Sequence, residues 1–439
     1  MNSADLSSVE LRAREDTMLT SGLQNFAVQA GRAMVKGRGS RLWDVEGREY
    51  IDFIGGIGVN SIGHCHPRYV KAIQDQVAEL TVGSFTTPVR IKFLELLRTV
   101  LPRHLTRVQL YSGGSESVEA AMRLAKSVTK KWEFLSFWGG FHGKTMGTMA
   151  LMGSTAKQGL GPFPPGNLSA PYPDCYRCPF NLKQDSCAMA CVDFTRKSLK
   201  AQSAGALAAI VVEPMQGTAG NILPPKGWLK AIAEIAKEND ALLICDEMIT
   251  GFGRTGTLFA SPAMEVEADI MTLGKGVAAG FPLSILACRE ELSTARPFGS
   301  PSGSSSSYGG NPLASAAALA TLQVILDEGL HENSARQGEK FLARLKAMKE
   351  KYTIIGEVRG MGLMLAMELV ENRETKKPLT AEKAMKLFKS GVEKGFLAMS
   401  YAPAVRFQPA LSITDEELAK GLDLLEQCVA ELNRDSQLS

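Results

Sequence analysis

The chain has 439 residues, of which 45% are hydrophobic and 22% charged, an ordinary balance for a globular protein. This length favours one large domain with a smaller partner domain. A formal net charge of +3 gives no reason to expect a nucleic-acid partner. No run approaches the roughly 20 apolar residues of a membrane span. Residues 1–16 mix charges where a signal peptide has an apolar stretch, so we expect a cytoplasmic protein without membrane or nucleic-acid partners.

The chain alternates between strand and helix patterns over its first two thirds. Residues 41–53 predict a hairpin with its turn at Glu46 and Gly47. Further strands are expected at 107–112, 134–137, 208–213, 241–246 and 269–273, and helices at 115–130 and 229–238. This alternation indicates an α/β fold whose largely parallel sheet is covered on both faces. In such a fold, ligands gather beyond the carboxyl ends of the strands.

The last third has a different pattern. Helices are expected at 312–328, 333–351, 380–394 and 414–432, with a glycine-interrupted β-like stretch at 354–368. The serine- and glycine-rich residues 299–310 predict a flexible loop. We expect the N-terminal hairpin to join the C-terminal part. The predicted domains are therefore 1–60 and 313–439 for a small α+β domain, and 61–312 for a large one.

Two polar residues end neighbouring apolar strands. Asp246 closes the strand before it, and Lys275 follows the next strand in the loop Leu273-Gly-Lys-Gly276. A pyridoxal-phosphate enzyme needs this pair, because the lysine carries the cofactor as a Schiff base and the aspartate keeps the pyridine nitrogen protonated. Separately, the lysine fits a surface loop and the aspartate a helix N-cap. Their succession after neighbouring strands favours the cofactor interpretation.

Two loops between these elements offer further contacts. Ser112-Gly-Gly-Ser115 joins a strand to a helix, and we assign a phosphate to Gly114 and Ser115 at the helix N-terminus. Phe141 can stack on a flat ring. His142 is better explained as a structural hydrogen-bonding residue than as a general base. Lys144 could attract a substrate carboxylate or could simply be solvated.

These segments together resemble the class III (subgroup II, ornithine/GABA-type) pyridoxal-phosphate-dependent aminotransferases of fold type I. The resemblance runs from about residue 41 to residue 432. Its most specific stretches are Leu242-Leu-Ile-Cys-Asp-Glu-Met-Ile-Thr-Gly-Phe-Gly-Arg-Thr-Gly256 and Ala268-Asp-Ile-Met-Thr-Leu-Gly-Lys275. Shorter matches are Gly63-His-Cys-His-Pro67, Phe141-His-Gly143, Val212-Glu-Pro-Met-Gln-Gly217, Tyr308-Gly-Gly-Asn-Pro312 and Val405-Arg-Phe407. The fold so implied has a mostly parallel, seven-stranded sheet in its large domain.

The resemblance implies a role for each site residue. Lys275 would form the Schiff base and shuttle a proton, Asp246 would bind the pyridine nitrogen, and Glu213 would support the site from its strand end. The resemblance also supports Gly114 and Ser115 as phosphate ligands, Phe141 as the stacking ring and His142 beside it. Ser307 stands where the family has a threonine that reaches the phosphate of the neighbouring subunit. A homodimer or higher homo-oligomer with shared active sites is therefore expected.

Other positions bear on the substrate. Arg406 matches the arginine that grips a substrate carboxylate. Many relatives pair this arginine with a glutamate where Thr218 stands, so Arg406 should stay available here. Ile57 is apolar where ornithine enzymes carry a polar recognition group, and Lys144 replaces an arginine. The implied reaction moves an amino group from an amino acid or amine, with an ω-amino acid favoured, to a 2-oxo acid such as pyruvate or 2-oxoglutarate by a ping-pong mechanism.

Two alternatives to transamination remain open from the sequence. An amino-acid racemase, an epimerase or a decarboxylating enzyme can use the same scaffold, and fold cannot separate these outcomes. A non-catalytic binding or metal-sensing protein is disfavoured by the presence of Lys275, Asp246 and Arg406 together.

Four of the eight cysteines cluster in sequence, at Cys175, Cys178, Cys187 and Cys191. Their spacing is compatible with a zinc or iron–sulfur site. A loop with reduced thiols or one disulfide explains them more simply, so no metal is assigned from the sequence.

Overall fold

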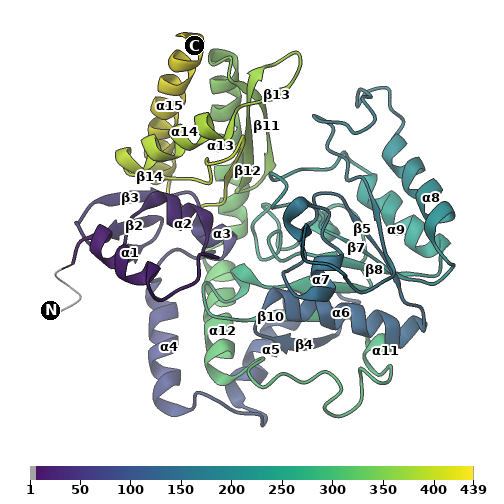
Figure 1. Cartoon of the computed structure of the whole chain (residues 1–439). Helices are drawn as coiled ribbons and strands as arrows, with labels where there is room; N and C mark the ends of the chain where they lie inside the picture. Colours follow the sequence, from purple (N-terminus) through teal and green to yellow (C-terminus); the bar gives the residue numbers. More distant parts are fainter. Residues whose placement is uncertain (1–5, 439) are drawn as a thin grey trace. The chain divides into compact units, whose positions relative to one another are not determined.

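The computed structural model describes residues 6–438, with side chains up to Asp435 (Figure 1). Contacts between Cα atoms divide the chain into two compact units. The central unit is Arg68–His331, and the terminal unit combines Met1–Pro67 with Glu332–Ser439. The terminal unit is therefore discontinuous in sequence, whereas the central unit is one continuous segment.

The central unit is built on a seven-stranded sheet with the order β4-β10-β9-β8-β7-β5-β6. Its strands are β4 (Arg107–Tyr111), β5 (Glu133–Phe137), β6 (Asn167–Ala170), β7 (Leu207–Val212), β8 (Leu242–Asp246), β9 (Ile270–Leu273) and β10 (Ser284–Cys288). The pairs from β9 through to β6 are all parallel, while β10 runs antiparallel to both β4 and β9. This confirms the α/β class and the mostly parallel sheet expected from the sequence.

Helices follow most of these strands in the central unit. They are α4 (Pro67–Glu79), α5 (Pro88–Val100), α6 (Gly114–Thr129), α7 (Met146–Ala150), α8 (Ala190–Gln202), α9 (Trp228–Glu238), α10 (Ala260–Ala263), α11 (Glu290–Ser293) and α12 (Pro312–Asp327). The sheet has an apolar core on each face because side chains alternate along a strand. In β8, Leu243 and Cys245 join the core that α8 and α9 cover, whereas Leu242 and Ile244 join the core beneath α6.

The terminal unit contains two smaller sheets. The first joins β1 (Met34–Arg38), β2 (Arg41–Asp44), β3 (Glu49–Asp52) and β14 (Phe396–Leu397). The second joins β11 (Ile355–Met361), β12 (Met364–Asn372), β13 (Lys377–Pro378) and β15 (Ala404–Phe407). Its helices are α1 (Ser8–Asp16), α2 (Asn25–Ala30), α3 (Gly55–Gly58), α13 (Leu330–Lys351), α14 (Ala381–Lys394) and α15 (Asp415–Leu438).

The expected hairpin of residues 41–53 is present as the antiparallel pair β2 and β3. Strand β3 also pairs in parallel with β14, so hydrogen bonds join the two ends of the chain. The fully buried Phe53 fixes the same junction, because its ring lies 5.2 Å from Phe341 and 5.1 Å from Phe396.

The boundary expected after residue 312 differs from the observed division, in which the central unit continues to His331. The reason is that α12 packs on α5 within the central unit. No single helix among residues 6–438 has both the length and the apolar character needed to cross a membrane; the bent pair α12 and α13 passes that test together, by length and composition only.

Candidate active site

Strands β7, β8 and β9 are parallel neighbours, so the residues that follow them emerge at one edge of the sheet. Glu213, Asp246 and Lys275 all occupy this edge, each at the last residue of its strand or within two residues of it. The sequence pattern predicted this arrangement, since each polar residue ends an apolar run.

Asp246 is 3% exposed and is held by three donors. Its Oδ1 accepts hydrogen bonds from Thr272 Oγ1 at 3.1 Å and from the amide of Met248 at 3.2 Å. Its Oδ2 lies 2.8 Å from Nδ1 of His142. A buried carboxylate is costly unless it is hydrogen-bonded or paired, and this one is both.

His142 lies in the loop after β5 and is 4% exposed. Burial by itself lowers the pKa of its imidazole. The hydrogen bond and charge of Asp246, with a smaller contribution from Glu213, outweigh burial and leave the pKa raised. The protonated form of His142 is therefore favoured beside the two carboxyl groups.

Glu213 is buried beside the same imidazole. Its Oε1 accepts the amide of Phe141 at 2.8 Å, and its Oε2 accepts the amide of Gly217 at 3.0 Å. Burial, followed by the charge of Asp246, raises the pKa of Glu213, while His142 and the two amides oppose this shift. The carboxyl group thus fixes the backbone of Phe141, the residue expected to stack on a ring.

Lys275 is half-buried and opens a short 3-10 turn, Lys275–Val277. Its φ of +43° is unusual for a residue with a side chain, and such strain is concentrated at functional sites. The preceding Gly274 allows a close approach of the backbone, because a Cβ there would lie 2.6 Å from the sulfur of Met248. Met248 itself follows Asp246, so the loops after β8 and β9 pack on each other.

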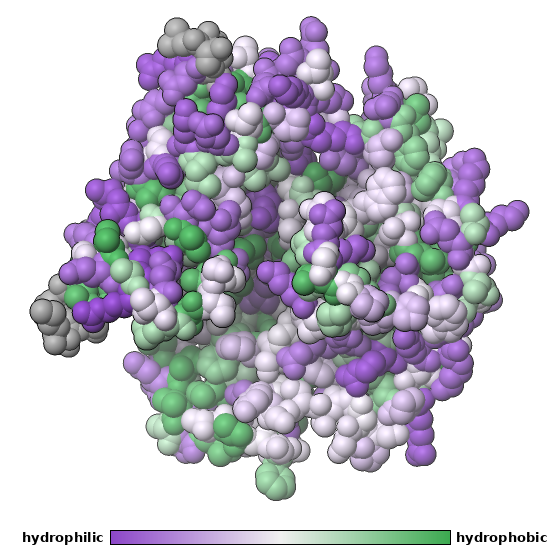
Figure 2. All heavy atoms as spheres, in the orientation of Figure 1, coloured by the Kyte–Doolittle hydropathy of each residue, from purple (hydrophilic) through white to green (hydrophobic). Residues whose placement is uncertain are grey.

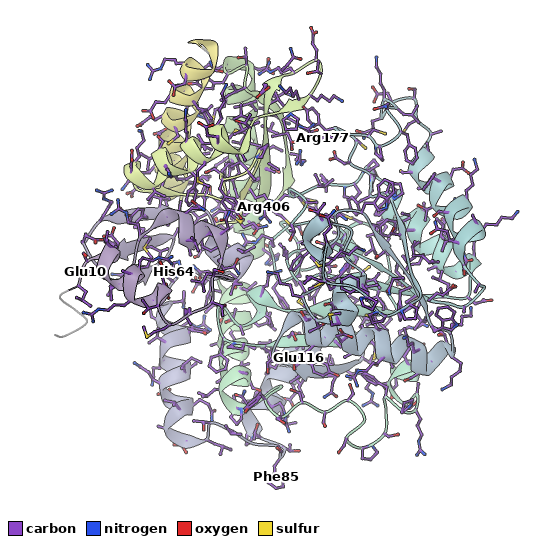
Figure 3. All side chains as sticks on the ribbon, in the orientation of Figure 1. Glu10, His64, Phe85, Glu116, Arg177 and Arg406 are labelled. Atoms are coloured by element: carbon purple, nitrogen blue, oxygen red, sulfur yellow. The ribbon has the colours of Figure 1, made fainter. Side chains whose placement is uncertain are left out.

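The expected phosphate loop joins β4 to α6. Intrahelical bonding begins with the amide of Glu116, which donates to the carbonyl of Gly113 at 3.0 Å. The amides of Gly114 and Ser115 precede that bond and belong to the first turn, whose donors a helix leaves for other partners. The carboxylate of Glu116 (labelled in Figure 3) accepts from the amides of Ser112 at 3.0 Å and Gly113 at 2.6 Å. It therefore caps the helix just before the two residues to which we assigned the phosphate.

The loop of residues 138–145 packs closely on the start of α6. The amide of Lys144 donates to Ser115 Oγ at 3.2 Å, although the Lys144 side chain is exposed. Gly143 has a φ of +128°, and a Cβ at this position would clash with Ser115 Oγ and Thr148 Oγ1. Glycine is therefore required by both conformation and space.

Ser307 belongs to the central unit, whereas Ile57 and Arg406 belong to the terminal unit. Ser307 is exposed in the segment before α12, which has no helix or strand. Ile57 has a φ of +62° and packs on an apolar cluster of the terminal unit. Arg406 is half-buried on β15, where it pairs with Ala366 of β12 (Figure 3).

A family model described as aminotransferase class-III matches residues 25–429. The chain belongs to this family. The aminotransferase is 36% identical to a leucine/methionine racemase from Thermococcus litoralis, over 91% of this chain and 90% of that protein. It is 37% identical to a 5-aminovalerate aminotransferase from Pseudomonas aeruginosa, over 90% and 92% respectively.

A solved amine transaminase from an uncultivated Pseudomonas species, in its form with bound pyridoxal phosphate (PLP), matches this aminotransferase with a TM-score of 0.89. Sequence identity is 28%, over 95% of this chain and 99% of that one. The family and this neighbour confirm the fold type I architecture, the transaminase activity and the PLP cofactor expected from the sequence.

The structure of this aminotransferase adds two supporting residues that the sequence analysis did not assign. The carboxylate of Glu247 is fully buried and accepts hydrogen bonds from Thr250 Oγ1, the amides of Ala260 and Ser261, and Ser261 Oγ, at 2.6–2.8 Å. It ties down the loop that follows Asp246. Glu116 is the second, and a signal was present, because a glutamate three residues after Gly113 matches the N3 position of a capping box.

All eight cysteines of the aminotransferase lie among the described residues, and all are free thiols. Burial, followed by the charges of Cys191, Cys187 and Cys178, raises the pKa of Cys175 to about 11. Within residues 6–438, no three histidine, cysteine or acidic side chains already surround a point where a metal ion could be held.

Proposed function

We propose that this aminotransferase moves the amino group of an ω-amino acid to a 2-oxo acid such as pyruvate or 2-oxoglutarate by a ping-pong mechanism. The observation that carries the chemistry is the pair of Asp246 and His142 at the sheet edge where Lys275 follows β9. The similarity to a 5-aminovalerate aminotransferase supports the substrate class.

The residues at the sheet edge fit a cofactor with a phosphate, a ring nitrogen and an aldehyde. Bound PLP supplies an electron sink for the pair left behind when a proton leaves the substrate carbon. The anionic carboxylate of Asp246 would hold the proton on the ring nitrogen. The first turn of α6, at Gly114 and Ser115, would bind the phosphate, and Phe141 would cover the ring.

Lys275 would carry the cofactor in the resting enzyme and act as the acid–base group during transfer. Once the amine of the substrate has taken its place on the cofactor, the freed amine of Lys275 would accept the proton that leaves the substrate carbon and hold it for the return transfer, so one residue serves both steps. His142 would keep Asp246 in place through their 2.8 Å contact. We therefore retain His142 as a positioning residue and not as a general base.

For the substrate, we propose that Arg406 binds a carboxylate through its planar guanidinium group. Thr218, which stands where the resemblance implies a glutamate in many relatives, carries no charge. Ile57 and Lys144 are proposed as further substrate contacts.

We propose a homodimer or higher homo-oligomer, in which Ser307 serves the phosphate of a neighbouring subunit. An apolar surface on the central unit supports this proposal. It comprises α4, α5 and the loop between them, with the exposed fraction reaching 85% at Phe85 and 59% at Val82. Figure 2 shows green, apolar surface in the lower part of the view, where Figure 3 labels Phe85. Such a surface marks an interaction site on a folded protein.

The proposed function is tested by following the visible absorbance of the PLP-loaded enzyme during a half-reaction. The enzyme is mixed with α-amino acids, ω-amino acids such as 5-aminovalerate, or diamines, without an oxo acid. Bleaching by an ω-amino acid, with recovery on adding pyruvate or 2-oxoglutarate, supports the proposal. Bleaching by α-amino acids alone refutes the substrate class.

Racemisation is a second candidate, because a leucine/methionine racemase is 36% identical over most of the chain. It predicts that one enantiomer of leucine or methionine loses its optical rotation without any oxo acid, while the absorbance persists. The cytoplasmic location stays a prediction.

A further inference from the structure

Strand β9 carries one polar residue, Thr272, among the apolar side chains of Ile270–Leu273. Thr272 is fully buried, with an exposed fraction of 0%. Valine has the same shape and is also a strong strand former, so neither packing nor the sheet requires a hydroxyl group here. Burying a hydroxyl group is costly unless it finds a hydrogen-bonding partner. The partner of this hydroxyl group therefore explains why threonine stands at this position.

The partner is the carboxylate of Asp246 on the neighbouring strand. Asp246 and Thr272 are paired in the parallel register of β8 and β9, two residues beyond the pair of Ile244 and Ile270. Because side chains alternate along a strand, both residues lie on the sheet face of Ile244 and Ile270, whose core lies beneath α6. Thr272 Oγ1 donates a hydrogen bond to Asp246 Oδ1 at 3.1 Å. The register of the sheet thus places the hydroxyl group beside the carboxylate.

The three donors around Asp246 are divided unequally between its two oxygens. Oδ1 accepts both the hydroxyl of Thr272, at 3.1 Å, and the amide of Met248, at 3.2 Å. Oδ2 lies 2.8 Å from His142 Nδ1. Since a carboxylate offers about two acceptor sites on each oxygen, Oδ1 has both of its sites filled by donors among residues 6–438, and Oδ2 keeps one site for a further donor.

An aspartate does not keep such an orientation through its rotamer alone. Its terminal torsion is broad and roughly two-fold, so the two oxygens can exchange places unless hydrogen bonds hold them. The amide of Met248 reaches Oδ1 from two residues along the chain, whereas the hydroxyl of Thr272 reaches it from a second strand. Two donors on one oxygen, coming from separate segments, oppose that rotation.

We propose that Thr272 is a positioning residue, whose hydroxyl group saturates Oδ1 of Asp246 and leaves Oδ2 as the oxygen that receives the N–H group of the cofactor ring. This inference rests on the proposed role of Asp246 toward the ring nitrogen. Thr272 acts through the orientation of the carboxylate and not through its charge. Because a charge-assisted hydrogen bond depends on alignment, a carboxylate that rotates would hold the ring less tightly even though it stays ionised.

The test measures the binding of two probes, by fluorescence titration, to the full-length enzyme from which PLP has been removed. The probes are PLP itself and the analogue in which a C–H group replaces the ring nitrogen. Thr272→Val removes the hydroxyl group and keeps the shape, whereas Thr272→Ser keeps the hydroxyl group. We expect Thr272→Val to weaken PLP binding roughly tenfold, as for a lost hydrogen bond to a charged group, and Thr272→Ser to stay within about threefold of the wild type. The analogue has no N–H group to offer, so it should bind the wild type and Thr272→Val equally.

The matched control is Thr195→Val. Thr195 is also fully buried in the central unit, but its hydroxyl group donates to the carbonyl of Cys191 within α8, at 2.8 Å. This variant should bind both probes as the wild type does. If Thr272→Val lost affinity equally for PLP and for the analogue, its role would be structural only and the proposal would be overturned. Unchanged PLP binding by Thr272→Val would overturn it as well.

The same titrations with Asp246→Asn separate this inference from the proposed function. The wild type should bind PLP more tightly than the analogue, and Asp246→Asn should lose that preference. If Asp246→Asn keeps the preference, the assignment of the ring nitrogen to Asp246 fails, and the proposed function fails with it. If Asp246→Asn loses the preference while Thr272→Val keeps it in full, the inference about Thr272 fails alone.

Discussion

Replacing Asp246 by asparagine tests the core of the proposed chemistry. The substitution keeps the side-chain volume and removes the negative charge. Asp246 is 3% exposed and its carboxylate lies 2.8 Å from His142, so the charge is shielded from solvent. Removing one partner from a buried charge pair costs about 3–5 kcal/mol. If the same free energy is lost from the interaction between residue 246 and the ring nitrogen of the cofactor in the transition state, the half-reaction slows by roughly 10²–10⁴-fold, at about 1.36 kcal/mol per tenfold.

The assay is stopped-flow bleaching of the PLP-loaded Asp246→Asn enzyme by the amino donor found most active with the wild type. Asp269→Asn is the matched control, because Asp269 lies just before β9, at the end of that strand opposite to Lys275, and its carboxylate accepts a hydrogen bond from the amide of Leu243 at 2.7 Å. The control should keep its half-reaction rate within about threefold. An Asp246→Asn enzyme that binds PLP and bleaches within about tenfold of the wild-type rate would refute the role given to this carboxylate.

Four further outcomes follow from the structure. Because the pKa of His142 is raised, its contribution to the free energy of unfolding is complete below its unfolded pKa of about 6.5 and is lost as pH rises through the folded value. In denaturant unfolding of the PLP-free protein, the difference in the free energy of unfolding between the wild type and His142→Gln should therefore narrow at higher pH. A difference that stays constant with pH would contradict this. Glu116→Gln should lower the free energy of unfolding by about 0.5–1 kcal/mol without weakening PLP binding, measured by fluorescence titration; weaker PLP binding would argue against phosphate at this turn. Gly143→Ala should lower the free energy of unfolding by about 1–3 kcal/mol, because Gly143 has a positive φ and an added Cβ would clash with Ser115. An unchanged melting temperature would contradict the close packing of Gly143 on Ser115. Phe85→Lys should shift the enzyme toward monomers in sedimentation, whereas Val9→Lys, at another exposed apolar residue, should not.

Local patterns predicted most of the elements that hold the site. The strands that end at Asp246 and Leu273 are short apolar runs bounded by polar or glycine residues, and the structure has both. The hairpin of residues 41–53 was equally predictable, because its turn residues separate two segments in which polar and apolar residues alternate. The positions of Asp246 and Lys275 at one sheet edge follow from these local signals together with the rule for parallel sheets.

Pairings between distant segments were not predictable in this way. The contact between His142 and Asp246 joins residues 104 positions apart, and no local pattern encodes it. Strand β10 was also missed, and so was its position between β4 and β9. Its mostly apolar sequence, Ser284–Cys288, does not indicate whether the strand runs parallel or antiparallel to its neighbours. The observed division into units also depends on distant contacts, since only packing on α5 assigns α12 to the central unit.

The antiparallel strand β10 sets the distance between two loops of the candidate site. Because β10 runs opposite to both β4 and β9, those two strands run the same way with one strand between them. The turn after β4, with Gly114, and the turn after β9, with Lys275, are thus separated by two strand spacings, about 10 Å. Ser284 of β10 adds a hydrogen bond to the carbonyl of Gly113 at 2.7 Å. Under the proposed assignment of the phosphate to Gly114 and of the Schiff base to Lys275, backbone hydrogen bonding therefore fixes the span between the two ends of the cofactor, so substitutions elsewhere in the site would change what the enzyme accepts without altering that span.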